Sequence, residues 1–516
     1  MQRPERILSS YTNGARSAPA GAERGEGVPA SDGVGGSGGA KPPGQEFVRP
    51  YVVSWNLTYR CNLACEHCYL DAGGTPLVDT ENFADRSELG TEECFRVIDE
   101  IAAFAPECVT ILTGGEPLLR RDIIEIVRRA AARELWVVVG TNGVRITENV
   151  ARRLAEAGAR GLSLSLDALD PDRHDRFRKV RGAWQNTVEG AEILNRTGLP
   201  FIVQTTAGSH NIGELDAIAD FAHDRLAAKV WNLYFLVPTG RGQFVSDITP
   251  AQYDEVLASL FRIQKKYQGR MLVNAKCAPH YIKTVLENAA QADPIPTGAE
   301  SAEAPSWSGS SPIRTYSGGA GGCPAGTHYM GIRPNGDVTP CPYLPVFAGT
   351  LRSSSLAELW NSSRLFTDIR RRTSLGGRCG ECEMNGHCGG CRARAYGMTG
   401  DLMAEDPLCS HTPGTFTGSP LLALRPPSHL RRFGEAGAVE NSGALAAHAI
   451  EYGPESPATI AWDDAAAARM KKIPAFVRGM VVRAVEDSCR KSGLDRVTVE
   501  ELERIRARMP TPKIFG

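Results

Sequence analysis

The sequence predicts an α/β fold in which a partial (β/α)6 barrel is followed by a cysteine-rich domain and then by a small helical domain. Three observations lead to this prediction. Short β-rich runs alternate with amphipathic helical stretches over the first half of the chain, ten of the 14 cysteines fall into two local groups, and a patterned helical stretch follows a segment containing Pro and Gly near the end. Strands that alternate with helices are typical of a parallel sheet.

Length and charge exclude several classes of protein. The 516 residues are enough for about two to four domains of ordinary size. Lys and Arg number 58 and Asp and Glu number 59, a balance that argues against a protein that binds nucleic acid. No apolar run approaches the ~18 residues of a membrane-spanning helix, and the first residues lack the apolar segment of a secretory signal. We expect a cytoplasmic protein that binds neither nucleic acid nor a membrane.

Three stretches rich in small and polar residues are predicted to be linkers. Residues 1–46, for example, cannot bury enough apolar area to offset the entropy lost on ordering. With the other patterns, they divide the chain into six expected units: residues 1–46, disordered; 47–245, the partial barrel; 246–322, a helical bridge and flexible insertion; 323–412, the cysteine-rich domain; 413–456, a linker; and 457–516, the small helical domain.

The barrel is predicted from six strands and the helices between them. The expected strands are Val52–Leu57, Val109–Thr113, Trp136–Gly140, Leu162–Leu166, Phe201–Thr206 and Val230–Leu236. The expected helices are Glu92–Phe104, Ile123–Ala132, Val150–Ala157, Asn186–Arg196 and Ile212–Asp224. Six units are too few for the closed eight-unit barrel, so we expect an open one whose chemistry lies on loops at the carboxyl ends of the strands.

The first cysteine group, hereafter the triplet, follows the first expected strand. Cys61, Cys65 and Cys68 have the spacing C-x3-C-x2-C, which lets one loop surround three corners of an iron–sulfur cube. Such clusters are normally held by four thiolates, so three leave one iron free for another ligand. Zinc is the alternative, but it needs a fourth ligand in tetrahedral geometry. The only local candidate, His67, lies between two of the cysteines.

The triplet, its place after the first strand and the partial barrel resemble the radical S-adenosylmethionine (SAM) enzymes over about residues 51–236. This resemblance implies a 4Fe–4S cluster whose free iron binds SAM. It also implies that one-electron reduction cleaves SAM to a 5′-deoxyadenosyl radical, which takes a hydrogen atom from the substrate. Reduced flavodoxin or ferredoxin is the expected electron donor.

Gly114-Gly115-Glu116-Pro117 closes the second expected strand and resembles the GGEP element of that family, which contacts the SAM amino group. Glycines there would let the backbone approach a ligand without a Cβ clash. Asn142 and Ser165, at later strand ends, are further candidates for contacting SAM. The alternatives are an ordinary strand-to-helix turn for the GGEP element and a simple turn at Asn142.

The second cysteine group has the spacing Cys323-x12-Gly336-x4-Cys341, then Cys379-x2-Cys382-x5-Cys388-x2-Cys391, then Cys409. This pattern resembles the SPASM domain of radical SAM enzymes, which holds one or two auxiliary 4Fe–4S clusters. A hairpin turn is expected at Asn335-Gly336-Asp337. The resemblance implies one cluster on Cys379, Cys382, Cys388 and Cys409, and another on Cys323, Cys341 and Cys391. The second of these would have an open iron or borrow a distant ligand such as Cys277. A zinc ribbon is the alternative for the four cysteines between residues 379 and 391.

Few other residues stand out as chemically significant, and no catalytic residue can be assigned. Cys94, Cys108 and Cys489 are expected to be buried small hydrophobic residues. The histidines at 280, 328, 387 and 411 are possible proton donors, although a lone histidine is more often structural.

The C-terminal stretch is predicted to be helical. Residues 474–492 carry a helical apolar stripe, Gly493 fits a helix stop, and Thr498 with Glu501 forms a capping box. With residues 473–478 and Glu486, this region resembles the small C-terminal domain of the B subunit of light-independent protochlorophyllide reductase, which contributes to tetrapyrrole binding. A dimerisation or packing hairpin is the alternative.

Two further segments, residues 235–242 and 329–343, resemble the heme and heme d1 biosynthesis branch of radical SAM enzymes. This resemblance implies an oxidoreductase or decarboxylase that removes a propionate carboxylate from a tetrapyrrole. Arg241 is predicted to pair with a substrate carboxylate, or else to be a solvated loop charge. A maturase of a ribosomally made peptide and a non-catalytic electron-transfer protein are the alternative functions.

Overall fold

The computed structural model describes residues 49–73, 87–245, 248–267, 270–290, 322–386, 388–416, 460–471, 481–482, 485–486 and 488–508. Residues 1–46 and nearly all of the two later expected linkers lie outside the described residues, as does His387. Within the described part of the chain, no helix combines the length and the apolar character that crossing a membrane requires.

The described residues form a ten-stranded sheet in the order β10-β9-β8-β1-β2-β3-β4-β5-β6-β7. From β1 to β7, every neighbouring pair is parallel, as a series of βα units predicts. The six expected strands are confirmed, with small shifts at their ends. Their bounds are β1 (Val52–Asn56), β2 (Val109–Thr113), β3 (Trp136–Gly140), β4 (Gly161–Ser165), β5 (Phe201–Ala207) and β6 (Val230–Phe235).

A seventh parallel strand, β7 (Leu272–Lys276), lies in the stretch that was expected to be a helical bridge. It pairs with β6 from Val230↔Leu272 to Tyr234↔Lys276. The expectation of a purely helical bridge is therefore wrong at Leu272–Lys276, which forms the edge strand of the parallel series. Asn274, in the middle of β7, is buried and donates from Nδ2 to Asn232 Oδ1 at 3.0 Å, which links the two strands, while its own Oδ1 is buried without a hydrogen-bond partner among the described residues.

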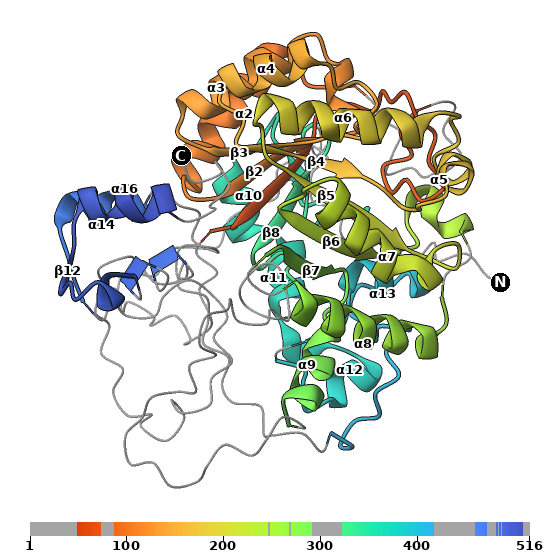
Figure 1. Ribbon diagram of the computed structural model, residues 1–516. Coiled ribbons are helices and arrows are strands. Elements are labelled where there is room, and N and C mark those ends of the chain that lie inside the picture. The colour runs from red at the N-terminus through yellow and green to blue at the C-terminus, as the bar shows by residue number, and fades with distance from the viewer. Residues whose placement is uncertain are drawn as a thin grey trace, which may run out of the picture.

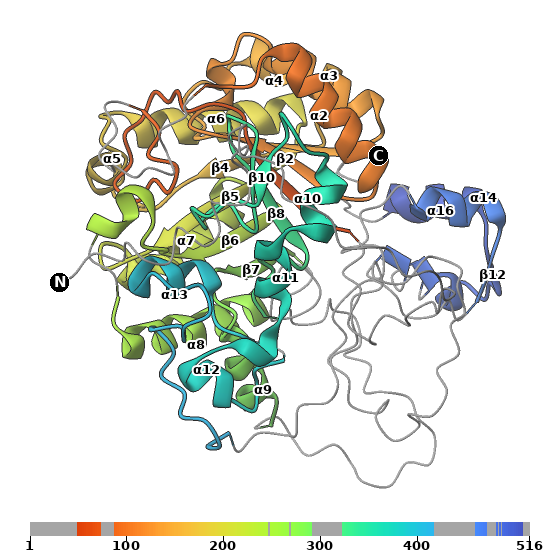
Figure 2. The same ribbon diagram turned by 180° about the vertical axis from the view of Figure 1, so that it is seen from behind.

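The cysteine-rich region extends the same sheet on its other side. β8 (Tyr329–Ile332) pairs parallel with β1, and it pairs antiparallel with β9 (Asp337–Thr339), which is followed by β10 (Gly349–Thr350). The expected hairpin turn is confirmed, with Gly336 at a φ of +92° between β8 and β9. The second cysteine group is therefore built onto the edge of the barrel beside β1 (Figure 2).

Helices cover the outer side of the curved sheet (Figure 1). Those of the barrel are α2 (Thr91–Phe104), α3 (Ile123–Ala132), α4 (Glu148–Glu156), α5 (Pro171–Arg178), α6 (Ala183–Thr197), α7 (Leu215–Asp220), α8 (Pro250–Lys266) and α9 (Tyr281–Ala290). The five expected helical stretches are confirmed. The last of them is divided into a 3-10 turn, α7 and a π turn. The short helix α5 was not predicted, because most of its residues are charged.

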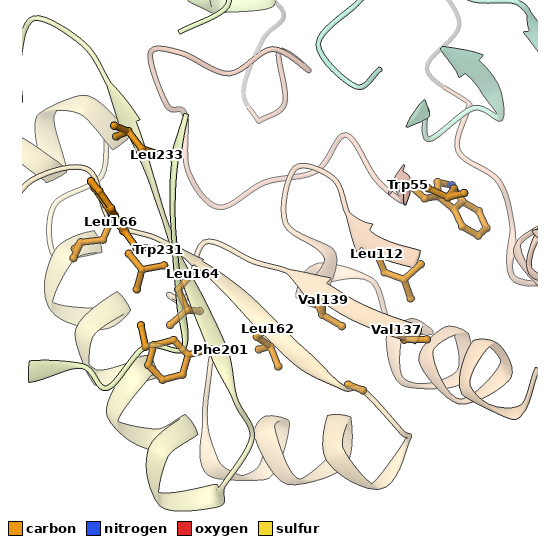
Figure 3. Close-up of a cluster of buried hydrophobic side chains, with 14 of the residues drawn as sticks. Trp55, Leu112, Val137, Val139, Leu162, Leu164, Leu166, Phe201, Trp231 and Leu233 are labelled. Atoms are coloured by element: carbon orange, nitrogen blue, oxygen red, sulfur yellow. The ribbon is translucent and has the colours of Figure 1, made fainter. Parts of the chain in front are cut away.

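Buried side chains between the strands and these helices form one continuous core. Figure 3 shows members of it from successive strands, including Trp55 on β1, Leu112 on β2, Val139 on β3, Leu164 on β4 and Trp231 on β6, all at most 1% exposed. Burial of each such side chain contributes on the order of 1.5–3 kcal/mol. This packing aligns the strands so that their carboxyl ends, and the loops that follow them, meet at one edge of the sheet.

The remaining helices belong to the two later regions. They are α10 (Leu356–Ser362), α11 (Arg364–Arg370), α12 (Gly377–Glu381) and α13 (Arg392–Thr399), followed by α14 (Asp464–Lys471) and α16 (Val499–Arg508). In the C-terminal region, β11 (Ala461–Trp462) pairs with β12 (Arg496–Val497), and Ala466, Val485, Cys489, Val497 and Ile505 form a small separate core.

One half of the predicted capping box is present at the start of the last helix, where Glu501 N donates to Thr498 Oγ1 at 3.2 Å. Gly493 has a φ of +69°, as its predicted role as a helix stop requires. The segment 473–478 and much of the expected helix over 474–492 lie outside the described residues.

Candidate functional site

The three thiols of the triplet lie on the loop that leaves β1 at its carboxyl end, where the sequence placed them. Several backbone hydrogen bonds hold this loop. Ala64 N donates to Arg178 O at 3.3 Å, which ties the loop to the end of α5, and Gly73 N donates to Tyr59 O at 3.1 Å, which closes it. The triplet is therefore presented by a loop that is anchored on the barrel at several points.

Each sulfur of the triplet has a hydrogen-bond donor. Leu63 N donates to Cys61 Sγ at 3.4 Å, Ala72 N donates to Cys68 Sγ at 3.4 Å, and Arg178 Nη1 donates to Cys65 Sγ at 3.5 Å. Burial raises the pKa of the Cys61 thiol to about 12 and also raises the pKa of Cys65. When unliganded, the thiols of Cys61 and Cys65 therefore keep their protons, and binding a metal must release them. The donors favour the charged thiolate and are among the groups that set cluster potentials.

Arg178 connects the triplet to the fourth strand. Its Nε donates at 2.7 Å to Oδ2 of Asp167, a residue just beyond the end of β4. Both side chains are buried. Burial by itself would raise the pKa of Asp167, but the Arg178 guanidinium outweighs it and the pKa falls to about 2. Arg178 was not predicted from the sequence, because its partner Cys65 is 113 residues away along the chain.

The glycines of the GGEP element pack against the cysteine loop. Gly115 N donates to Thr58 O at 2.7 Å, and Glu116 N donates to Arg60 O at 2.8 Å. A Cβ on Gly114, whose φ is +146°, would lie 2.8 Å from Thr58 O, and a Cβ on Gly115 would collide with Arg60 O. Only glycine allows the two loops to approach this closely. This packing between loops was not predicted from the sequence.

Glu116 joins the ends of β2 and β3. Its fully buried carboxylate accepts hydrogen bonds from Thr141 Oγ1 at 2.8 Å and from Asn142 N at 2.9 Å. Burial raises its pKa to about 7. Asn142 Nδ2 in turn donates to Asn62 Oδ1 at 2.9 Å and lies 4.0 Å from Cys61 Sγ. Two predicted site residues, Glu116 and Asn142, therefore meet beside the triplet.

Ser165 is the last residue of β4, in register with Gln204 on β5. It stands at the carboxyl edge of the sheet, two residues before the buried Asp167.

Arg241 does not have the role predicted for it. Its side chain is buried and holds the cysteine loop through three bonds: Nε donates to Cys65 O at 2.9 Å, Nη1 to Asp71 Oδ1 at 2.8 Å and Nη2 to Ala72 O at 2.9 Å. All three nitrogens are engaged within the protein. Both expectations for Arg241, a substrate contact and a solvated loop charge, are therefore wrong, because folding brings residues 170 positions apart together.

Four thiols of the second group line one pocket. They belong to Cys379, Cys382, Cys388 and Cys409. Backbone N–H groups donate to three of these sulfurs: Met384 to Cys382 at 3.3 Å, Gly390 to Cys388 at 3.5 Å, and Asp406 to Cys379 at 3.5 Å. Gly390 has a φ of +59°, and a Cβ there would lie 3.1 Å from Cys379 Sγ. A thiol-lined pocket with N–H groups directed at the sulfurs fits an iron–sulfur cluster.

The other three thiols, Cys323, Cys341 and Cys391, are buried in a neighbouring apolar cluster. Asp406 links this three-thiol group to the four-thiol pocket, and so does a hydrogen bond from Cys323 N to Cys388 O at 3.0 Å. Asp406 Oδ2 accepts from Cys391 N at 2.7 Å, while Asp406 N donates to Cys379 Sγ. The carboxylate is fully buried, and it also accepts from Arg394 Nη1 at 3.0 Å. The two arginines after Cys391, at 392 and 394, are fully buried, and no sequence pattern had marked them as structural.

A mixed set of ligand atoms lies at the rim of the four-thiol pocket. Atoms of Cys382, Glu383 and His411 lie within 4.8 Å of one another, a combination that would suit zinc. The Glu383 carboxylate, however, already accepts from Gly414 N at 3.0 Å and Phe416 N at 3.1 Å, and pairs with His411 Nε2 at 3.0 Å. These hydrogen bonds explain the position of the Glu383 carboxylate without a metal. The four thiols are therefore a better candidate ligand set for this pocket than Cys382, Glu383 and His411.

Family models match three parts of the chain. The radical SAM superfamily model matches residues 55–222, an iron–sulfur cluster-binding (SPASM) domain model matches residues 323–391, and a model of the proto-chlorophyllide reductase 57 kD subunit matches residues 462–506. The chain is also 35% identical over 365 residues to an AdoMet-dependent heme synthase of Methanosarcina barkeri, covering 71% of this chain and 97% of that protein. The chain belongs to the radical SAM superfamily. Its cofactors are therefore SAM, a SAM-binding 4Fe–4S cluster and auxiliary 4Fe–4S clusters.

Other relatives of this radical SAM enzyme bear different names. A pre-heme d1 synthase of Dinoroseobacter shibae is 30% identical over 389 residues, which is 73% of this chain and 90% of that protein. A mycofactocin maturase of Mycobacterium ulcerans is 30% identical over 367 residues, 70% of this chain and 88% of that protein. Among solved structures, Streptococcus suis SuiB bound to S-adenosylmethionine shares the fold, with a TM-score of 0.53, 17% identity, and coverage of 70% of this chain and 78% of SuiB.

Proposed function

We propose that this radical SAM enzyme is an oxidoreductase that removes the carboxylate from a propionate side chain of a tetrapyrrole. The observation that carries this proposal is the identity to the M. barkeri AdoMet-dependent heme synthase, which extends over 97% of that protein. The match of residues 462–506 to a proto-chlorophyllide reductase subunit supports it independently, because the name of that family also refers to a tetrapyrrole.

The ligand sets are part of the proposal. Cys61, Cys65 and Cys68 hold the SAM-binding cluster, and the four-thiol pocket and the three-thiol group hold auxiliary clusters. Gly114, Gly115, Glu116, Asn142 and Ser165 contact SAM. The contacts of Glu116 and Asn142 beside the triplet support this assignment, since both side chains lie against the loop that presents the cluster.

When bound, the reduced cluster and SAM supply a 5′-deoxyadenosyl radical, which takes a hydrogen atom from the propionate β-carbon. The carboxylate then leaves as carbon dioxide, a carbon–carbon double bond forms, and one electron remains. The four-thiol pocket or the three-thiol group would hold the auxiliary cluster that would take up that electron. The chain itself fixes the cysteine loop through Arg241 and Arg178 and supplies hydrogen-bond donors to its sulfurs.

We also propose that the protein works in the cytoplasm with reduced flavodoxin or ferredoxin as the electron donor. All 14 cysteines are free thiols in the structure. Free thiols in such number suit a reducing compartment.

The test uses full-length protein that is reconstituted without oxygen and supplied with SAM, a one-electron reductant and an iron porphyrin bearing propionates. We expect 5′-deoxyadenosine and a porphyrin that has lost carbon dioxide and two hydrogen atoms. Cys61→Ala, Cys65→Ala and Cys68→Ala should form neither product. Cys108→Ala is the matched control, because Cys108 is buried in the barrel core with its Sγ 3.5 Å from Thr110 Oγ1. SAM cleavage retained in a triplet variant would refute that ligand assignment.

A peptide maturase is the second candidate, supported by the 30% identity to a mycofactocin maturase. The same assay distinguishes the two functions. If 5′-deoxyadenosine forms but no porphyrin of reduced mass appears with any propionate-bearing iron porphyrin, the tetrapyrrole substrate is wrong. A change in mass of a small precursor peptide would then establish the maturase.

A further inference from the structure

We infer that Cys277 is the fourth thiolate ligand of the auxiliary cluster held by Cys323, Cys341 and Cys391, so that this cluster has no open iron. The inference rests on the proposed function, in which the three-thiol group holds a cluster. It adds a ligand from outside the second cysteine group, supplied by the barrel strand that the sequence did not predict.

The position of Cys277 follows from β7. The strand ends at Lys276, so the next residue lies at the carboxyl edge of the sheet, where the cysteine-rich region packs against the barrel. The Cys277 side chain packs against the apolar cluster that contains Cys323, Cys341 and Cys391. Four thiols from four separate segments of the chain therefore lie in one buried place.

The Cys277 thiol interacts directly with one thiol of the three-thiol group. The side chains of Cys277 and Cys391 are hydrogen-bonded to each other, and Cys391 belongs to the same buried cluster as Cys323 and Cys341. A metal would replace that shared proton.

The backbone conformation of Cys277 is held in place by its surroundings. Its φ is +57°, a conformation that residues with a side chain rarely adopt and that persists only where the surroundings enforce it. Arg394 enforces it here, because its Nη2 donates to Cys277 O at 2.9 Å. The same guanidinium donates to Asp406, which accepts from Cys391 N. One buried network thus fixes both cysteines of the hydrogen-bonded pair.

The remaining cysteines have other positions. Cys94 and Cys108 lie in the barrel core, and Cys489 lies in the small core of the C-terminal region. The structure describes all 14 cysteines. Of the four that belong to neither cysteine group, Cys277 is the one that packs against the three-thiol group. Four thiolates are the usual complement of a 4Fe–4S cluster, and Cys277 completes it.

The test isolates the auxiliary clusters. In full-length protein carrying Cys61→Ala, Cys65→Ala and Cys68→Ala together, all cluster iron belongs to the cysteine-rich region. Adding Cys277→Ala should remove one cluster's share of iron and sulfide or convert that cluster to a three-iron form with its own EPR signal. Adding Cys108→Ala instead should leave the iron content and the EPR spectrum unchanged. Cys277→Ser, which offers an oxygen ligand, should keep the iron but shift the EPR spectrum of one cluster.

The outcomes separate this inference from the proposed function. A triple-alanine protein with no cluster iron refutes the auxiliary clusters themselves. A triple-alanine protein with cluster iron whose amount and EPR spectrum are unaffected by Cys277→Ala overturns the role of Cys277 alone. If Cys277→Ala does not fold, Cys277→Ser decides, and an unchanged spectrum counts against the inference. A Cys277–Cys391 disulfide found by mass spectrometry in the oxygen-free holoprotein would also overturn it.

Discussion

The rings of Tyr69 and Tyr343 pack against each other with their centroids 4.6 Å apart. Tyr69 directly follows Cys68 of the triplet, and Tyr343 lies two residues after Cys341 of the three-thiol group. Tyr69 also donates from its hydroxyl to Asn56 Oδ1 at 2.8 Å, at the end of β1. This aromatic pair is therefore a direct contact between the loop that carries the triplet and the segment after β9 that carries Cys341.

Removing one ring of this pair should loosen the barrel from the cysteine-rich region. We expect Tyr343→Ala to lower the free energy of unfolding by about 3 kcal/mol, since it removes a large packed ring and leaves a cavity. Tyr343→Phe keeps the ring and should stay within about 1 kcal/mol of the wild type. Denaturant unfolding of the oxygen-free holoprotein measures both. Equal stability of the two variants would show that the ring contact contributes little.

Arg178 offers a prediction about the first cluster, because it contacts both Cys65 Sγ and Asp167. Arg178→Met should leave the Asp167 carboxylate buried without its partner and destabilise the fold by about 3–5 kcal/mol. Loss of the donor to sulfur should also lower the reduction potential of the SAM-binding cluster.

The double variant Arg178→Met with Asp167→Asn separates these two effects. The double variant has no unpaired Asp167 charge, so it should regain much of the free energy of unfolding lost in Arg178→Met. The reduction potential of the SAM-binding cluster should stay lowered, and a redox titration followed by EPR measures it. A potential equal to that of the wild type in both variants would exclude Arg178 as a tuning group.

Glu116 should make the protein less stable as the pH rises. Its pKa is about 7 in the folded protein and near 4.5 when exposed, so between these values the folded chain holds a proton that the unfolded chain has lost. Stability from this group is complete below about pH 4.5 and is lost as the pH rises through about 7, a change of about 3 kcal/mol. Glu116→Gln should flatten this part of the stability curve, measured by urea unfolding without SAM. An unchanged slope would mean that the Glu116 carboxyl titrates normally.

Removing the chain after Ser456 should separate the C-terminal region from the SAM chemistry. The small core of this region, which includes Ala466 and Val485, does not share members with the barrel core. We expect the truncated protein to keep SAM cleavage and to bind an iron porphyrin less tightly, as measured by optical titration. Binding equal to that of the full chain would assign this region a purely architectural role.

The sequence by itself determined the parts of this protein that depend on local pattern. Strands β1 to β6 follow from short apolar runs between turn residues, and the spacing of Cys61, Cys65 and Cys68 predicted a cluster loop at the end of β1, because one loop must hold all three ligands. The hairpin at Gly336 and the cap at Thr498 were likewise predicted from neighbouring residues.

Only the tertiary structure decided which buried charges and thiols meet. Arg241 contacts Asp71 across 170 residues, Arg394 contacts Cys277 across 117, and Asn274 on β7 donates to Asn232 on β6 across 42. A buried charge or thiol is stabilised by whatever partner folding brings within about 3–4 Å, and that partner leaves no periodic trace in the nearby sequence.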